Sequence, residues 1–138
     1  MNANTDILNP KSTQLVDLWF DGLPPNPNRT RGQHWSKTYT VGQEWKRTAF
    51  YLAKQAYRGA PAEHAHLHYH ISVGDNRVHD ADNIEASLKS LQDGLKGVLF
   101  VDDSIDHITR SFSYSREKPR GIRLIVSRLE LLQEPGLS

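Results

Sequence analysis

The strict alternation of side chains over residues 64–73 constrains the fold of this chain more than any other feature. Histidines occupy every second position, and mainly apolar residues stand between them. The histidines are His64, His66, His68 and His70. Because successive side chains of a strand point to opposite faces, this stretch predicts a strand with one histidine face and one apolar face. Two neighbouring imidazoles could share a transition metal, but no closing ligand follows at a known zinc spacing, so structural or dimer-contact histidines are favoured.

Periodic patterns elsewhere predict two helices and three further strands. Apolar residues recur at helical spacing over residues 43–57 and 82–95, and Asp82 with Glu85 indicates a capping box for the second helix. The remaining predicted strands cover residues 15–21, 105–115 and 121–129, and the last two are expected to form a hairpin that turns at residues 118–121. We therefore expect an α+β fold with a mixed sheet and the order β-α-β-α-β-β.

Length and composition favour one domain of ordinary soluble character. The chain has 138 residues, and we expect a domain over residues 14–130 between a frayed N-terminus, residues 1–13, and a loose tail, residues 131–138. Cysteine is absent, which excludes disulfides and thiolate metal sites. No apolar run approaches the roughly 20 residues that span a bilayer, and no signal-peptide pattern opens the chain. A cytoplasmic location without a membrane partner is the default expectation.

The charges are sorted along the chain although the net charge is only +1. Residues 26–58 and 107–128 are mostly basic, whereas residues 75–106 are mostly acidic. Basic flanks would attract a polyanion and an acidic centre would bind a cation, although a chance sorting of surface charges remains the alternative. The candidate DNA-binding residues are Arg29, Arg31, Lys37, Lys46, Arg47, His79, Arg110, Lys118 and Arg120. Residues 29–39 are expected to form a basic loop in which Trp35 either anchors the loop or stacks on an unpaired base.

The acidic centre contains the strongest candidate for a catalytic site. Asp80 and Asp82 directly precede a predicted helix, and Asp102 and Asp103 follow a short apolar run. Carboxylate oxygens suit Mg²⁺ and Mn²⁺, which can generate a hydroxide nucleophile and stabilise a leaving oxygen. A nearby lysine could neutralise charge that develops on a phosphate. The alternatives are a plain helix cap for Asp82 and a turn for Asp102 and Asp103.

The acidic residues stand in a longer pattern that resembles a known nuclease family. The pattern runs Asp80-x-Asp82-Asn83, then Lys89-x-x-x-Asp93-Gly94-Leu95, then Gly97-Val98-x-x-x-Asp102-Asp103. It resembles the RusA family of Holliday junction resolvases, which are crossover junction endodeoxyribonucleases, many of them carried by phages and prophages. The resemblance extends upstream to the proline-rich stretch at residues 23–29 and covers roughly residues 18–128. It implies a RusA-like fold.

The resemblance also implies an activity and a set of site residues. Members of the family are small homodimeric Mg²⁺-dependent endonucleases that nick four-way DNA junctions in pairs, in DNA recombination and repair, and Mn²⁺ is the expected substitute. By resemblance, Asp80, Asp82 and Asp103 are the metal-binding catalytic carboxylates, and Lys89 is the catalytic lysine. The family lysine falls at Ala86 here, so either the helix start carries a one-turn insertion or the lysine role has moved. A simple ladder of Lys89 with acidic residues four positions away is the alternative.

Two other functions compete with the endonuclease. The first is a non-catalytic branched-DNA-binding protein of the same fold, which would bind junctions without nicking them. The second is a phosphotransferase or phosphatase of small substrates, since paired aspartates also serve there. The partition into acidic and basic segments argues against the second.

Overall fold

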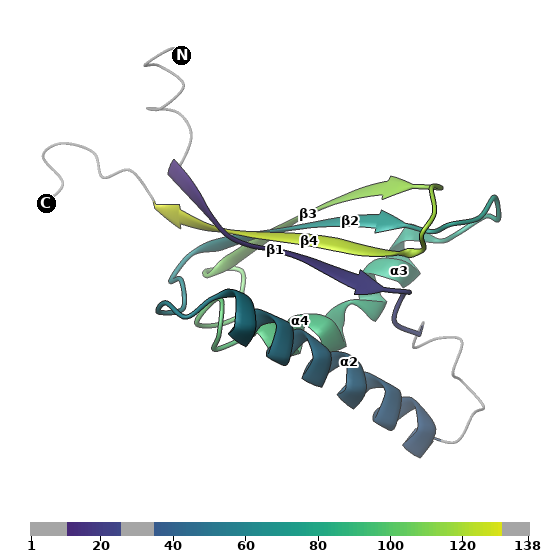
Figure 1. Ribbon diagram of the computed structural model, residues 1–138, viewed down its shortest axis with the longest axis horizontal. Coiled ribbons are helices and arrows are strands. Elements are labelled where there is room, and N and C mark those ends of the chain that lie inside the picture. Colours follow the sequence, from purple (N-terminus) through teal and green to yellow (C-terminus); the bar gives the residue numbers. More distant parts are fainter. Residues whose placement is uncertain (1–10, 26–34, 131–138) are drawn as a thin grey trace, which may run out of the picture.

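Four strands form one mixed sheet, and the helices pack on a single face of it (Figure 1). The computed structural model describes residues 11–25 and 35–130. The strands are β1 Lys11–Asp21, β2 Ala65–Ser72, β3 Ile108–Ser115 and β4 Gly121–Glu130. The helices are α2 Trp35–Ala56, α3 Ala81–Ser87 and α4 Lys89–Leu95. The expected α+β class and the order of strands and helices are confirmed, with the second helical segment divided into α3 and α4 at Leu88.

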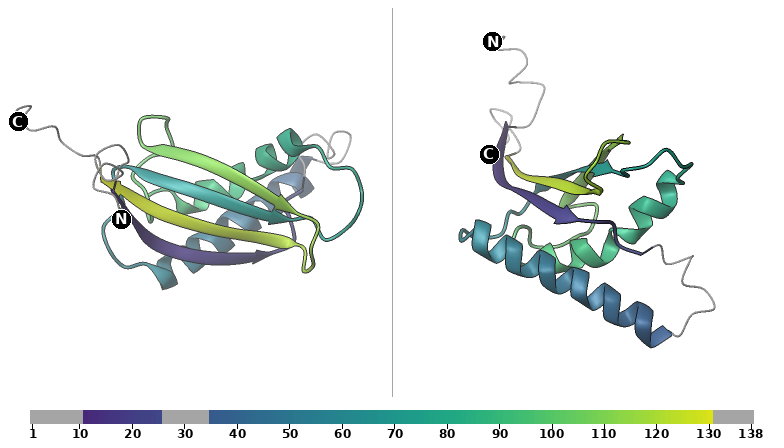
Figure 2. Two further views of the ribbon diagram at one scale, coloured as in Figure 1. Left: turned by 90° about the horizontal axis from the view of Figure 1, so that it is seen from above. Right: turned by 45° about the vertical axis from the view of Figure 1, so that its right-hand side comes forward.

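Strand β2 has the two different faces that its alternation predicts. Ala65, Leu67, Tyr69 and Ile71 are fully buried, and they form part of the hydrophobic core between the sheet and the helices. The intervening histidines are only half-buried and lie on the opposite face of the strand. The left view in Figure 2 looks onto the sheet with the helices behind it, which is the face that no described helix covers.

The predicted hairpin between the last two strands is wrong. The sheet order is β1-β4-β2-β3, so β2 separates β3 from β4. Strand β3 pairs parallel to β2 after the crossover through α3 and α4, and β4 returns to pair antiparallel with both β2 and β1. Burial explains why β4 and not β3 lies inside the sheet. Ile122, Leu124 and Val126 of β4 are fully buried, whereas most of β3 is exposed or half-buried. The more apolar strand takes the central position, where both of its edges are hydrogen-bonded.

Helix α2 begins at Trp35 rather than at Gln43, so residues 35–39 are helical and the predicted basic loop is wrong for them. The β-branched residues and Gly42 in this stretch have low helix propensity, which is why the pattern alone does not indicate a helix. Ala49 and Ala53 are fully buried on the face that α2 turns toward the core, as their spacing predicts.

The predicted apolar stripe along the second helical segment is confirmed, but the predicted start of the helix at Asp82 is wrong. Leu88, Leu91 and Leu95 are fully buried. The cap of α3 is Asp80, whose Oδ1 accepts a hydrogen bond from the backbone nitrogen of Asp82 at 2.9 Å. Glu85 does not complete a capping box, because its carboxylate accepts a hydrogen bond from a tyrosine hydroxyl of β3 instead. The helix therefore starts one residue before Asp82.

Strand β1 begins at Lys11, so residues 11–13 belong to the sheet and not to a frayed terminus. Their backbones pair with the end of β4, which gives hydrogen-bond partners to a stretch without apolar periodicity. Residues 1–10 and the predicted loose tail, residues 131–138, lie outside the described residues. Within the described ranges, no helix is long and apolar enough to cross a membrane.

Candidate functional site

Lysines and aspartates that the pattern spreads over residues 89–103 form one charged cluster. Lys89 Nζ lies 3.1 Å from Asp93 Oδ1 and 2.9 Å from Asp103 Oδ2. Lys96 Nζ lies 3.1 Å from Asp102 Oδ1 and 3.8 Å from Asp103 Oδ1. The helical ladder considered as an alternative for Lys89 is therefore present toward Asp93. The contact with Asp103 joins residues 14 positions apart, and no helical ladder accounts for it.

A tight turn after α4 carries Asp103 back to Lys89. Gly97 has φ +84°, a conformation that glycine adopts without strain. The backbone of Ala62 then anchors the turn, because its nitrogen donates to the carbonyl of Leu99 at 2.9 Å and its carbonyl accepts from Val101 at 3.0 Å. Leu99 and Phe100 are fully buried. Core packing therefore positions the two aspartates that follow.

The contacts in this cluster shift the pKa values of its members. A hydrogen bond from Lys89 lowers the pKa of Asp103, and a hydrogen bond from Lys96 lowers the pKa of Asp102. The hydrogen bond to Asp103, followed by the one to Asp93, raises the pKa of Lys89. At neutral pH Asp102 and Asp103 are ionised and Lys89 is protonated, because their pKa values are shifted away from neutrality. The cluster therefore holds a lysine cation against a carboxylate that stays negative.

Asp80 and Asp82 lie at the start of α3, and both are exposed. Their carboxylates and that of Asp103 have the hard oxygen atoms that Mg²⁺ prefers, so the donor chemistry fits the metal that the resemblance implies. Among the described residues, however, no three histidine, aspartate or glutamate side chains form a group that could hold a metal ion. Asp80 instead caps α3, and Asp103 contacts Lys89.

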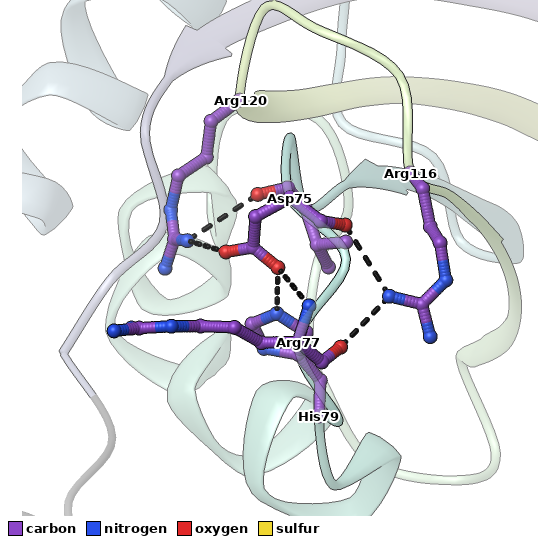
Figure 3. A network of polar contacts seen from close by, with 6 residues as sticks. Asp75, Arg77, His79, Arg116 and Arg120 are labelled. Carbon is purple, nitrogen blue, oxygen red and sulfur yellow. Dashed lines mark hydrogen bonds and ion pairs between the residues drawn. The ribbon is translucent and has the colours of Figure 1, made fainter.

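Three arginines gather around the loop that leads from β2 to Asp80 (Figure 3). The carboxylate of Asp75 accepts hydrogen bonds from His79 Nε2 at 2.7 Å and from the backbone nitrogen of Arg77 at 3.0 Å, and it lies 3.5 Å from Arg120 Nη1. Arg116 Nη1 donates to the carbonyl oxygens of Asp75 and Arg77, at 3.2 and 2.7 Å. The hydrogen bond from His79 is the main cause of the lowered pKa of Asp75. This network holds cationic side chains against the loop whose last residues precede Asp80.

Arg77 was not among the candidate DNA-binding residues, because it is the one basic residue at the start of the acidic segment.

The predicted candidates fall on several parts of the fold. Lys46 and Arg47 are exposed on α2, and Lys37 belongs to the same helix. Arg110 lies on β3, 5.7 Å from the ring centre of Phe112. Lys118 is exposed in the β3–β4 loop together with Arg120, while Arg29 and Arg31 lie outside the described residues.

The histidines of β2 form a hydrogen-bonded ladder with hydroxyl groups of β3. His66 contacts Thr109 Oγ1 at 2.6 Å and Ser111 Oγ at 2.7 Å. His68 contacts the same Ser111 at 2.6 Å and Ser113 at 3.0 Å. His70 continues the row by contacting Ser113 at 2.7 Å. The parallel register of the two strands brings the rings of His66 and His68 each between two hydroxyls, which favours the structural interpretation of these histidines.

Protonation of this ladder is expected to destabilise the fold. Burial, followed by the charge of His68, lowers the pKa of His66 from its usual 6.5. The folded state therefore prefers the neutral ring, so its contribution to stability is complete above pH 6.5 and is lost as pH falls through 6.5 toward the lower folded value. We expect the free energy of unfolding to decrease between about pH 7.5 and 5, by at most ~1.4 kcal/mol per pH unit for one proton.

Urea denaturation at several pH values measures this dependence, and His66→Gln should flatten it. His107→Gln is the control, because His107 contacts a backbone carbonyl instead of the ladder. The carboxylates with lowered pKa values, such as Asp103, contribute only near and below their usual value of 3.8 and do not overlap this range. A dependence that is equally steep in His66→Gln would contradict the assignment to His66.

No protein-family model matches the chain, and no curated protein matches it. The resemblance to the RusA family therefore rests on the motif residues themselves.

Proposed function

We propose that this protein is a Mg²⁺-dependent endonuclease that resolves four-way DNA junctions by paired nicks and acts as a homodimer. The observation that carries the proposal is the contact of Lys89 Nζ with Asp103 Oδ2 at 2.9 Å. Both residues belong to the motif, and a turn anchored in the core brings them together across 14 positions. The observed order of strands and helices is the order that the periodic patterns of the sequence predict.

The proposed reaction divides its tasks among residues of the site. Asp80, Asp82 and Asp103 would hold Mg²⁺, which would supply a hydroxide nucleophile and stabilisation of the leaving oxygen of the phosphodiester. Lys89 is protonated, since its pKa is raised, and its ammonium group can neutralise charge that develops on the phosphate. Arg116 and Arg120 are suited to hold flanking phosphates, because carbonyl oxygens and Asp75 already orient their guanidinium groups.

Incubation of the full-length protein with a labelled four-way junction and a matched linear duplex tests this function. With Mg²⁺ we expect symmetric nicks in the junction alone, and EDTA should abolish them. Equal nicking of the duplex would contradict selectivity for junctions. Hydrolysis of a small phosphoester without affinity for DNA would replace the proposal with a phosphatase.

A non-catalytic branched-DNA-binding protein is the second candidate, and one observation favours it. Asp80, Asp82 and Asp103 are not part of a common metal-binding group, and Lys89 already offsets the charge of Asp103. Tight binding of the junction without nicking, with either Mg²⁺ or Mn²⁺ at any pH, would establish this function. It would exclude the endonuclease.

Replacement of Lys89 by methionine separates a catalytic lysine from a structural one. The side chain is 64% exposed, so loss of its ion pairs should cost less than about 1 kcal/mol of stability. Loss of its charge should slow nicking at least about a hundredfold if it neutralises the transition state. Single-turnover nicking and urea denaturation measure the two effects.

Lys96→Met is the matched control for that variant. Lys96 approaches the same Asp103, at 3.8 Å, but has no place in the motif. Its loss should slow nicking less than about tenfold, because an exposed ion pair contributes little. Comparable losses in both variants would mean that the charge of Asp103 matters and that Lys89 has no specific role.

A further inference from the structure

A groove of about 560 Å³ lies between α2 and the end of α4. One wall is a face of α2 that carries Lys46, Arg47, Phe50 and Tyr51. The opposite wall is formed by the last turn of α4 and the turn that follows it, including Lys96. The groove thus adjoins the charged cluster, because Lys96 also contacts Asp102.

Cations and aromatic rings alternate along α2 in two neighbouring rows. Lys46 and Phe50 are four residues apart, and so are Arg47 and Tyr51, which places the members of each pair on one side of the helix about 6 Å apart along its axis. Phe50 is 39% and Tyr51 58% exposed, and their rings meet edge to face at 5.8 Å. Lys54 extends the first row, with its Nζ 5.7 Å from the ring centre of Phe50.

The charges of the groove favour an anion along α2. Neither Lys46 nor Arg47 forms an ion pair with any residue in the described part of the chain. Asp93 is the acidic side chain in the lining, and Lys89 lies 3.1 Å from its carboxylate. The positive charge of the α2 wall is therefore not neutralised across the groove.

We propose that this groove binds an unpaired DNA strand, with bases against Phe50 and Tyr51 and phosphates against Lys46 and Arg47. Exposed aromatic rings can stack on a base only when its face is free, whereas a duplex keeps base faces stacked on each other. The positive charge of the groove would suit any polyanion. The aromatic rings between the cations favour a single strand, because only its bases have free faces. The position of this strand beside Asp103 rests on the proposed function, but its binding requires no cleavage.

Fluorescence anisotropy of the full-length protein tests the groove, with a labelled single strand of about 15 nucleotides and the matching duplex in EDTA. Tyr51→Ala should weaken binding of the single strand about fivefold to a hundredfold, and Tyr51→Phe should retain it because the stacking ring remains. Arg47→Gln should reduce the slope of log affinity against log salt by about 0.7, the value for one phosphate contact on a single strand. Trp19→Ala is the control, because Trp19 is an exposed aromatic residue of β1 outside the groove.

The outcomes distinguish this proposal from the proposed function. Loss of single-strand binding in Tyr51→Ala, with Trp19→Ala unchanged, supports the groove even if the wild-type protein never nicks a junction. Wild-type affinity in Tyr51→Ala overturns the groove even if nicking is confirmed. Equal losses in Tyr51→Ala and Trp19→Ala, or equal losses for single strand and duplex, would also overturn it.

Discussion

Replacement of Asp82 by asparagine is expected to abolish Mg²⁺-dependent nicking of a four-way junction while binding of the junction survives or strengthens. The proposed function gives Asp82 a role in holding the metal, so loss of its carboxylate should reduce the rate about a hundredfold to a thousandfold. Binding should not suffer, because the change removes a negative charge beside DNA phosphates. A nicking assay and an electrophoretic shift in EDTA measure the two effects on the same preparation.

Asparagine is the informative replacement at Asp80 and Asp103 as well. Asp80 caps α3, and an alanine there would cost about 0.5–2 kcal/mol of stability, whereas asparagine retains a capping oxygen. Asp106→Asn is a suitable control, since Asp106 is an exposed acidic residue shortly after Asp103 and outside the motif. Loss of binding together with nicking would show that these aspartates are structural. Unchanged nicking in Asp82→Asn would overturn the proposed metal site.

Replacement of Gly94 by alanine is expected to destabilise the fold by about 1–3 kcal/mol, the usual cost of overpacking. A Cβ atom at this position would lie 2.2 Å from the carbonyl oxygen of Lys46 and 3.0 Å from the Cβ of Ala49. The obstruction is helix backbone, which cannot move aside without separating α4 from α2. Thermal and urea denaturation should both report the loss.

Gly42→Ala is the matched control, because it makes the same substitution within α2 where space is available. The nearest atom to its added Cβ is the Cβ of Ser90 at 3.9 Å, an ordinary contact. Alanine has the higher helix propensity, so Gly42→Ala should stabilise the protein by up to about 1 kcal/mol. The two variants are thus expected to act in opposite directions. A gain of stability in Gly94→Ala would contradict the close packing of α4 on α2.

The sequence supplied the members of the candidate site but only some of their contacts. Lys89 and Asp93 lie four residues apart on one helix, so helical spacing alone indicates their ion pair. The contact with Asp103 depends on the left-handed turn at Gly97 and on the backbone pairing with Ala62, and neither has a periodic signature. Phe50 and Tyr51 were not among the candidate residues, since an aromatic residue on a helix looks the same in the sequence whether it is buried or exposed.

The sequence by itself determined the local structure of this protein, namely the two-faced strand β2, the apolar stripe of α3 and α4, and the chemistry of the acidic motif. The strand faces and the helical stripe repeat with the period of one strand or helix, so neighbouring residues are sufficient to reveal them, and the chemistry of the motif follows from its residue types. Only the tertiary structure decided that β4 lies between β1 and β2, that α2 begins at Trp35, and that Lys89 meets Asp103. Those outcomes depend on which apolar faces are buried together and on which backbone groups then form hydrogen bonds. Both depend on contacts between segments that are distant in the sequence.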